Sequence, residues 1–219
     1  MTVCPENWFP PVVVIAGTGI IGKSGKISRD ILRWLARAEL IACSEAFLPM
    51  LGDFNVEKIT IKSPLEPLIE RIKKESETRR VMVLASGDPL FHGIGRQLGA
   101  ILGRDRIIVL PNISSVQYLF ARLAIPWDDV LFFSLHREER RDFFYWLRLG
   151  RKVAILTSPK NSPSYIANLV ADYEMSDMVD IAVGENLGAK DERIVITSAE
   201  EVSGLKWREP NVVALLPRT

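Results

Sequence analysis

Apolar and polar positions alternate in blocks through the first half of the chain. Short apolar runs that are mostly β-branched or bounded by turn residues predict buried strands at Val12–Ala16, Leu40–Cys43, Val81–Ala85 and Ile107–Leu110. Apolar residues at helical spacing predict helices over residues 31–38, 68–72 and 116–123. This alternation predicts an α/β fold with a largely parallel sheet that helices cover on both faces.

The alternation breaks at residues 124–129, where Pro126 disfavours a continuous helix. We therefore expect two α/β domains, an N-terminal one over 1–126 and a C-terminal one over 127–219. Further strands are predicted at Val130–Ser134, Val153–Thr157, Ile181–Val183, Arg193–Thr197 and Val212–Leu216, with a helix over 163–173. Little helical pattern separates the last two strands, which predicts an antiparallel edge near the end of the chain.

Composition narrows the class of protein. The chain has 219 residues, of which 47% are apolar and 25% charged, with a formal charge of +1. This mixture excludes a disordered chain, and the balanced charge argues against a general nucleic-acid binder. Two separated cysteines, Cys4 and Cys43, predict reduced thiols, and neither a signal peptide nor a membrane span is recognisable. We expect a soluble cytoplasmic protein with no membrane partner.

The predicted first strand ends in a glycine-rich loop, Gly17-Thr18-Gly19-Ile20-Ile21-Gly22-Lys23-Ser24. The loop matches both the GxGxxG pattern of dinucleotide-binding folds and the GxxxxGK[ST] pattern of P-loops. Both patterns require a helix that begins at the last glycine and faces an anion. Here Gly25 and Lys26 follow, and the apolar helical face starts only at Ile31. A tight turn that brings main chain close to another ligand is the third interpretation.

Each nucleotide interpretation also lacks a well-placed acid. A P-loop needs a magnesium-binding carboxylate at a strand end, but Asp88 comes late after Val81–Ala85. In a dinucleotide fold, Glu45 could bind the ribose, although it lies somewhat far along the chain. Both alternatives stay open at this point, as does a simple turn that needs positive φ at glycine.

A second loop follows Val81–Ala85 and has the sequence Ser86-Gly87-Asp88-Pro89-Leu90-Phe91-His92-Gly93. Loops at the carboxyl ends of parallel strands are where α/β folds bind ligands. Gly87 permits close approach of the main chain, and Pro89 fixes the backbone after Asp88. Taken alone, the segment also fits an Asp-Pro turn in which Asp88 caps its own backbone.

Taken together, these loops resemble the tetrapyrrole methylase superfamily, and more narrowly its branch that methylates C5 of a corrin precursor. The resemblance covers residues 12 to 217. It is carried by Leu84–Gly95, Pro111–Gln117, Phe120–Leu123, Pro126–Asp129, Ser134–Arg137, Lys160–Pro163, Gly184–Gly188 and Asp191–Ile194. Long segments in a fixed order make this resemblance more specific than either glycine motif.

The resemblance implies two α/β domains with S-adenosylmethionine (SAM) bound in the cleft between them, and no metal. The family's cofactor contacts fall on Gly19, Ile20, Ser86, Gly87, Asp88, Phe91, Ser114, Ser115, Thr157, Asn186 and Leu187. Many such contacts involve the main chain, so their side chains vary. Since a sulfonium already activates the methyl group, alignment in a dry cleft supplies much of the catalysis.

The implied reaction is SAM-dependent methylation of C5 of a (cobalt-)precorrin in cobalamin biosynthesis. If a proton leaves the acceptor carbon, His136 is the candidate base, with His92 a weaker candidate for a substrate role. Lys23, Arg137 and Lys160 are candidates to pair with the carboxylates of the tetrapyrrole. Residues 1–126 hold 16 basic and 12 acidic residues, so +4, and residues 127–219 hold 12 and 15, so −3.

The resemblance also bears on partners and on alternatives. It implies a homodimer. Family members sometimes carry a fused C15-methylating, decarboxylating partner, and since 219 residues leave no room for one, we expect any such partner on a separate chain. The first loop departs from the family pattern at Ile20–Lys26, which leaves substrate identity open. A relative acting on another tetrapyrrole, on rRNA or on a modified histidine is the near alternative. A P-loop or dinucleotide-binding protein, or a non-enzymatic SAM binder, is the more distant one.

Overall fold

The computed structural model describes residues 4–20, 27–52, 54–135 and 140–218. The chain divides into two compact units, Met1–Ser114 and Ser115–Thr219. This division falls before the boundary expected at Pro126. Helix α4 (Ser115–Leu123) accounts for the difference, because it packs on strand β10 (Asn211–Pro217) and so belongs to the second unit.

The first unit contains a parallel sheet, as the sequence predicts. Its described strands are β1 (Val13–Gly17), β2 (Leu40–Cys43), β3 (Glu57–Thr60), β4 (Val81–Ala85) and β5 (Ile107–Leu110). Their order is β3-β2-β4-β1-β5, and every neighbouring pair is parallel. The carboxyl ends of β1, β4 and β5 therefore lie next to one another at one edge of the sheet.

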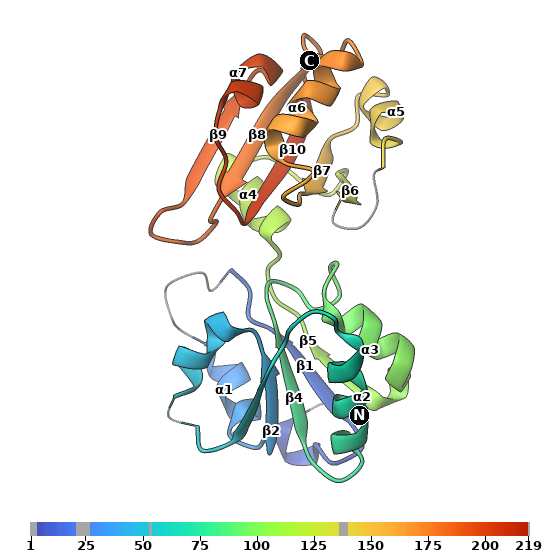
Figure 1. Cartoon of the computed structure of the whole chain (residues 1–219), viewed down its shortest axis with the longest axis vertical. Helices are drawn as coiled ribbons and strands as arrows, with labels where there is room; N and C mark the ends of the chain where they lie inside the picture. The colour runs from blue at the N-terminus through green and yellow to red at the C-terminus, as the bar shows by residue number, and fades with distance from the viewer. Residues whose placement is uncertain (1–3, 21–26, 53, 136–139, 219) are drawn as a thin grey trace. The chain divides into compact units, whose positions relative to one another are not determined.

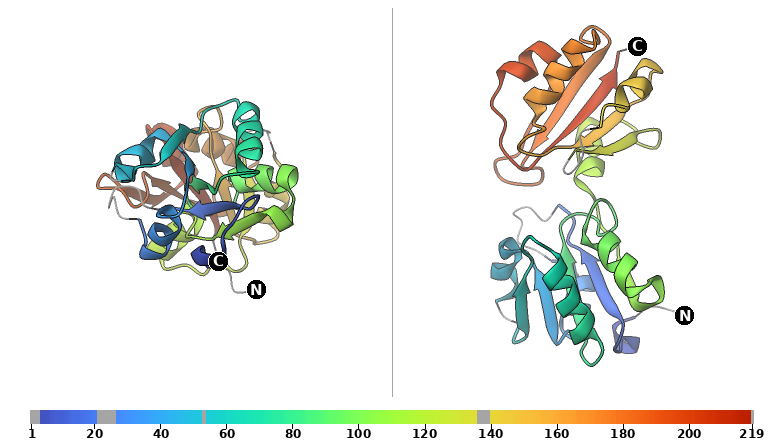
Figure 2. Two further views of the ribbon diagram at one scale, coloured as in Figure 1. Left: turned by 90° about the horizontal axis from the view of Figure 1, so that it is seen from below. Right: turned by 45° about the vertical axis from the view of Figure 1, so that its right-hand side comes forward.

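Helices cover both faces of this first sheet (Figures 1 and 2). They are α1 (Arg29–Leu35), α2 (Glu66–Ser76) and α3 (Ile94–Leu102), with 3-10 turns η1 (Pro5–Asn7), η2 (Glu45–Leu51) and η3 (Arg104–Arg106). Alternate residues of each strand point to opposite faces, so Val14 packs with α1 whereas Val13 packs with α2 and α3. The expected double coverage is confirmed for this unit.

The second unit contains a mixed sheet. Its described strands are β6 (Leu131–Ser134), β7 (Val153–Leu156), β8 (Val179–Glu185), β9 (Arg193–Thr197) and β10, in the order β6-β7-β10-β8-β9. Among the described strands of this unit, only β6 and β7 pair in parallel; β10 lies in the middle and is antiparallel to both neighbours. The antiparallel pairing is therefore central as well as at the edge, where β9 pairs with β8.

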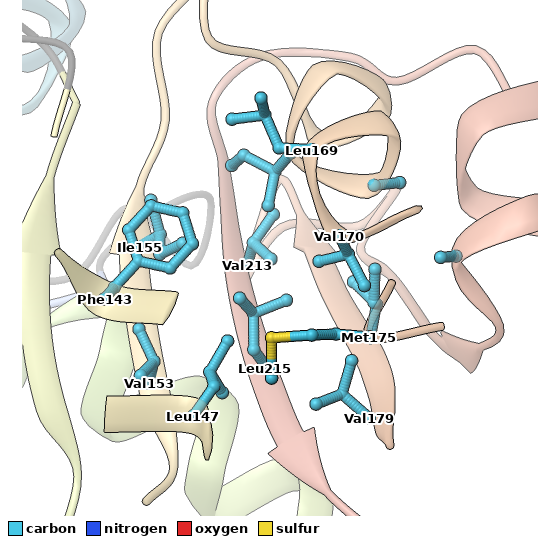
Figure 3. Packing of buried hydrophobic residues seen from close by; sticks show 14 of the residues in the cluster. Phe143, Leu147, Val153, Ile155, Leu169, Val170, Met175, Val179, Val213 and Leu215 are labelled. Carbon is cyan, nitrogen blue, oxygen red and sulfur yellow. The ribbon is translucent and has the colours of Figure 1, made fainter. Parts of the chain in front are cut away.

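The main core of the second unit lies between its sheet and the helices α5 (Phe143–Arg148), α6 (Pro163–Asp172) and α7 (Ala199–Gly204). Figure 3 shows Val213 and Leu215 of β10 facing Val170 and Met175 in this core. On α5, Phe143 and Phe144 are buried, whereas Tyr145 and Trp146 are exposed.

Among the described elements, strand β3 and helices α3, α5 and α7 were not predicted from the sequence pattern. Strand β3 carries a single buried residue, Ile59, so its apolar signal is too short to detect. Helix α7 has only six residues, and Ser198 caps it by accepting a hydrogen bond from the Glu201 main-chain N–H. Among the described residues, no helix is long and apolar enough to cross a membrane.

Candidate functional site

The loops after β1 and β4 are joined through their main chains. The Thr18 N–H donates to the carbonyl of Ala85 at 2.8 Å. Gly19 and Gly87 then form an antiparallel bridge in which each N–H donates to the other carbonyl at 3.2 Å. Both glycines have positive φ, +65° and +63°, a conformation that other residues rarely adopt. Two of the predicted cofactor residues are thus adjacent in space.

The junction leaves no room for side chains at two glycines of the first loop. A Cβ atom at Gly17 would lie 2.5 Å from the carbonyl oxygen of Gly87 and 2.8 Å from Cδ of Pro89. A Cβ at Gly19 would lie 2.5 Å from Oδ1 of Asn112. These glycines therefore allow a close approach between segments of chain, and the close approach to a ligand in the third interpretation of the loop stays a prediction.

Asp88 organises the second loop. Its Oδ1 accepts hydrogen bonds from the main-chain N–H groups of Leu90 at 2.8 Å and Phe91 at 3.2 Å. Its Oδ2 accepts from the N–H of Asn112 at 3.4 Å. The side chain therefore caps its own turn and also holds the loop after β5. A direct contact between Asp88 and a cofactor stays a prediction.

Asn112 lies at this junction, although sequence reasoning assigned it no role. Its Nδ2 donates to the carbonyl of Gly17 at 2.9 Å, and its Oδ1 accepts from the N–H of Ile113. Together with the bond from its main-chain N–H to Asp88, these contacts tie the ends of β1, β4 and β5 to one residue. Its position in the Pro111–Gln117 segment, which carries the family resemblance, was the available signal for a role at the site. Its hydrogen-bond partners Gly17 and Asp88 are far away in sequence, so this role could not be predicted.

The remaining candidates of the first unit lie around this junction. Ser86 is exposed, Gly87 and Ile20 are half-buried, and Ser114 is buried beside Gly87. The Phe91 ring meets the ring of exposed His92 edge-on, with centroids 5.0 Å apart. His92 itself has a φ of +55°. Lys23 lies outside the described residues.

The structure around the first loop differs from that of a P-loop or a dinucleotide-binding motif, in which a helix begins at the last glycine. Helix α1 begins only at Arg29, where Ser28 caps it by accepting from the N–H of Ile31 at 3.3 Å. The N–H groups of Thr18 and Gly19 are engaged with the second loop rather than directed at an anion. Glu45, the possible ribose acid, pairs with Lys62 at 2.8 Å.

In the second unit, two predicted cofactor residues flank the start of β10. The hydroxyl of buried Thr157 donates to Asn211, whose Oδ1 is 2.6 Å away and whose main-chain oxygen is 2.7 Å away. The N–H of Asn186 donates to the carbonyl of Pro210 at 2.9 Å. Asn211 therefore holds the predicted cofactor residue Thr157 in place, a contact that sequence reasoning did not predict.

The loop after β7 is fixed by buried polar groups. Both the Ser158 hydroxyl, at 3.2 Å, and Nδ2 of Asn161, at 2.7 Å, donate to the carbonyl of Leu135. The N–H of Asn161 donates in turn to Ser158 Oγ. Lys160 is exposed on this loop. His136 and Arg137 lie outside the described residues.

Leu187 occupies the space that glycine leaves on strand β8. A Cβ at Gly184 would lie 2.8 Å from Cδ2 of Leu187 and 3.0 Å from Cδ1 of Leu119 on α4. The half-buried Leu187 side chain thus packs against Gly184 and Leu119 of the second unit. Ser115, the remaining candidate, is the first residue of α4.

Comparison with known proteins gives the family. The model of the tetrapyrrole (corrin/porphyrin) methylases matches residues 12–203. The chain belongs to this family. This membership confirms the resemblance inferred from the loops. The glycine loop is therefore explained as part of this family, without a P-loop or a dinucleotide-binding motif.

Relatives and solved structures agree with this assignment. The chain is 33% identical to the cobalt-precorrin-7 C(5)-methyltransferase of Salmonella typhimurium, over 84% of the chain and 89% of the relative. The precorrin-6Y methylase of Archaeoglobus fulgidus is 26% identical with a TM-score of 0.71, covering 95% and 99% of the two chains. The uroporphyrin-III C-methyltransferase of Thermus thermophilus, solved with S-adenosylhomocysteine (SAH), shares the fold at 20% identity and a TM-score of 0.71, covering 93% and 91%.

Proposed function

We propose that this protein transfers a methyl group from SAM to C5 of a cobalt-precorrin in cobalamin biosynthesis. The observation that carries the proposal is the 33% identity to a cobalt-precorrin-7 C(5)-methyltransferase over nearly the full length of that relative. The match to the family model, over residues 12–203, includes the joined glycine loops of the first unit and the loops after β7 and β8. A relative named for the C5 reaction alone also supports placing any C15-methylating partner on a separate chain.

The joined loops suit a ligand with a flat base and a zwitterionic tail. Gly19 and Gly87 carry no side chains, so the joined main chain can lie against such a ligand while their own N–H and carbonyl groups stay paired with each other. The N-terminus of nine-residue α4, at Ser115, favours a carboxylate through the positive end of the helix dipole. We assign these features to SAM, together with Ile20, Ser86, Asp88, Phe91, Ser114, Thr157, Asn186 and Leu187.

The chemistry then requires positioning more than activation. SAM supplies a methyl group that its sulfonium already activates, so the protein needs no nucleophile of its own. Asp88 and Asn112 fix the loops that bind it, and rigid loops hold reactants at the short distance that transfer requires. His136 is assigned to proton removal, and Lys23, His92, Arg137 and Lys160 to the substrate and its carboxylates.

Isothermal titration calorimetry with SAH tests the proposal. We expect micromolar affinity for SAH and no heat with ATP–magnesium or NAD(P). Incubation with SAM and cobalt-precorrin-7 should then add one methyl group, at C5, by mass spectrometry and NMR. Binding of ATP–magnesium by the wild type and its loss in Lys23→Ala would instead support a P-loop.

The same assay separates the related alternatives. Methylation of uroporphyrinogen, rRNA or a modified histidine in place of the precorrin would keep the cofactor and change the substrate. SAH binding without any methyl transfer would point to a non-enzymatic SAM binder. We further propose a cytoplasmic homodimer that needs no metal, to be checked by light scattering and by activity after chelation.

A further inference from the structure

Glu192 joins the turn after β8 to helix α4. Its Oε2 accepts a hydrogen bond from the main-chain N–H of Gly188 at 2.6 Å. Its Oε1 pairs with Nε of Arg122 on α4 at 3.0 Å, and the hydroxyl of Tyr118, one helical turn earlier, also donates to it. One carboxylate therefore binds the turn on one side and two residues of the helix on the other.

The turn that Glu192 holds has an unusual backbone. Asn186 and Gly188 both have positive φ, 46° and 74°. A positive φ costs free energy at a residue with a side chain, so the surrounding contacts must hold Asn186 in place. Asp191 supplies one such contact by accepting from Asn186 Nδ2 at 3.0 Å, and Glu192 supplies the bond at Gly188.

The surroundings of Glu192 keep it charged. Only 15% of its side chain is exposed, against 56% for Arg122. Burial acts to raise the pKa of Glu192, but the hydrogen bonds from Gly188, Tyr118 and Arg122 outweigh it, and the net pKa is lowered. Burial and the hydrogen bond to Glu192 raise the pKa of Tyr118, so the phenol stays protonated as a donor.

We propose that Glu192 is a positioning residue for the cofactor: it fixes the turn at Asn186–Gly188 to α4. This inference rests on the proposed function, because the proposed function assigns SAM as the ligand of this turn. Through Gly188 and α4, Glu192 connects two segments assigned to SAM, the turn with Asn186 and Leu187 and the helix that begins at Ser115. No reacting atom needs to touch Glu192 for this role.

The test compares Glu192→Ala with Glu192→Gln in the full chain. Loss of the carboxylate in Glu192→Ala should weaken SAH binding by on the order of tenfold in calorimetry, the scale expected for lost charge-assisted hydrogen bonds. Glu192→Gln keeps an oxygen that accepts from Gly188, so it should retain most of the affinity. In turnover, KM for SAM should rise in Glu192→Ala while kcat changes little.

Asp180→Ala is the matched control. Asp180 lies at the other end of β8 and also pairs with an arginine, Arg218, at 2.8 Å. This variant should bind SAH as the wild type does. Hydrogen–deuterium exchange without ligand should show faster exchange at residues 186–189 in Glu192→Ala only.

The outcomes separate the two proposals. If the wild type binds SAH and a folded Glu192→Ala binds it equally well, the positioning role is wrong and the proposed function stands. Equal weakening in Asp180→Ala would also overturn the role, since it would indicate a general loss of stability. If the wild type does not bind SAH, the proposed function fails and the cofactor role of Glu192 fails with it.

Discussion

In the first unit, the loops after β1 and β4 meet through main-chain bonds between Gly19 and Gly87, whereas in the second unit the turn after β8 is held by carboxylate side chains. The first junction depends on the absence of side chains, because neighbouring atoms already lie 2.5 Å from the place of a Cβ at Gly17. The second depends on charge, through Glu192 and Arg122. The two assigned cofactor regions should therefore respond to different perturbations.

A further carboxylate shows the same reliance on charge in the second unit. Glu185, the last residue of β8, is fully buried. It accepts from the main-chain N–H of Arg208 and pairs with Arg193 at 3.2 Å. The Arg193 guanidinium also lies over the ring of Trp207, 4.7 Å from its centroid. In the first unit, by contrast, Asp88 is the one acidic group bonded into the described junction, and its bonds are to main-chain N–H groups.

The largest effect is expected from Gly17→Ala. The added methyl must displace the Gly87 carbonyl and Pro89, neither of which is the end of a flexible side chain. We expect a loss of about 3 kcal/mol in the free energy of unfolding, at the upper end for overpacking, and loss of SAH binding. Urea denaturation and calorimetry measure both. The matched change Gly184→Ala meets the movable ends of Leu187 and Leu119 and should cost less; an equal cost would contradict the steric account.

A smaller effect is expected from Asp88→Ala. The change removes the acceptor for Leu90 and Phe91 while leaving the main-chain bridge in place, so we expect a loss of about 1–2 kcal/mol. SAH binding should weaken while unfolding remains cooperative in urea. Asp88→Asn keeps an acceptor oxygen and should lie between Asp88→Ala and the wild type. Unchanged affinity in Asp88→Ala would restrict this residue to capping its turn.

The smallest effect is a pH dependence that belongs to the second unit. Since folding lowers the pKa of Glu192, its stabilising contribution is present above its ordinary value near 4.5 and is lost as pH falls through the folded pKa. The difference in unfolding free energy between the wild type and Glu192→Gln should therefore shrink as the solution is acidified below that value. Urea titrations across this range measure it. A difference that stays constant with pH would contradict the electrostatic account of this turn.

The local pattern of apolar and polar residues was sufficient to predict much of the fold and part of the candidate site. Strands β1, β2 and β4 are buried along their whole length and appear as apolar runs, because strands covered on both faces need apolar residues throughout. Strand β5 is an apolar run as well, but the expectation that it is buried was wrong, since at the edge of the sheet its residues are half-buried. Strand β3 could not be found in this way, since it lies at the edge of the sheet and buries only Ile59. The central position of β10 in its sheet could not be predicted from local pattern either, because it depends on pairing with residues distant in sequence.

The sequence by itself determined the α/β class, the family and the loops that carry the assigned site, since apolar periodicity and motifs such as Ser86–Gly95 are local properties of the chain. Only the tertiary structure decided what individual side chains do. Asn112 connects Gly17 and Asp88, and Glu192 connects Gly188 and Arg122, through bonds between segments that folding brings together. The geometry of a hydrogen bond depends on where both partners lie in space, and spacing along the chain does not specify that.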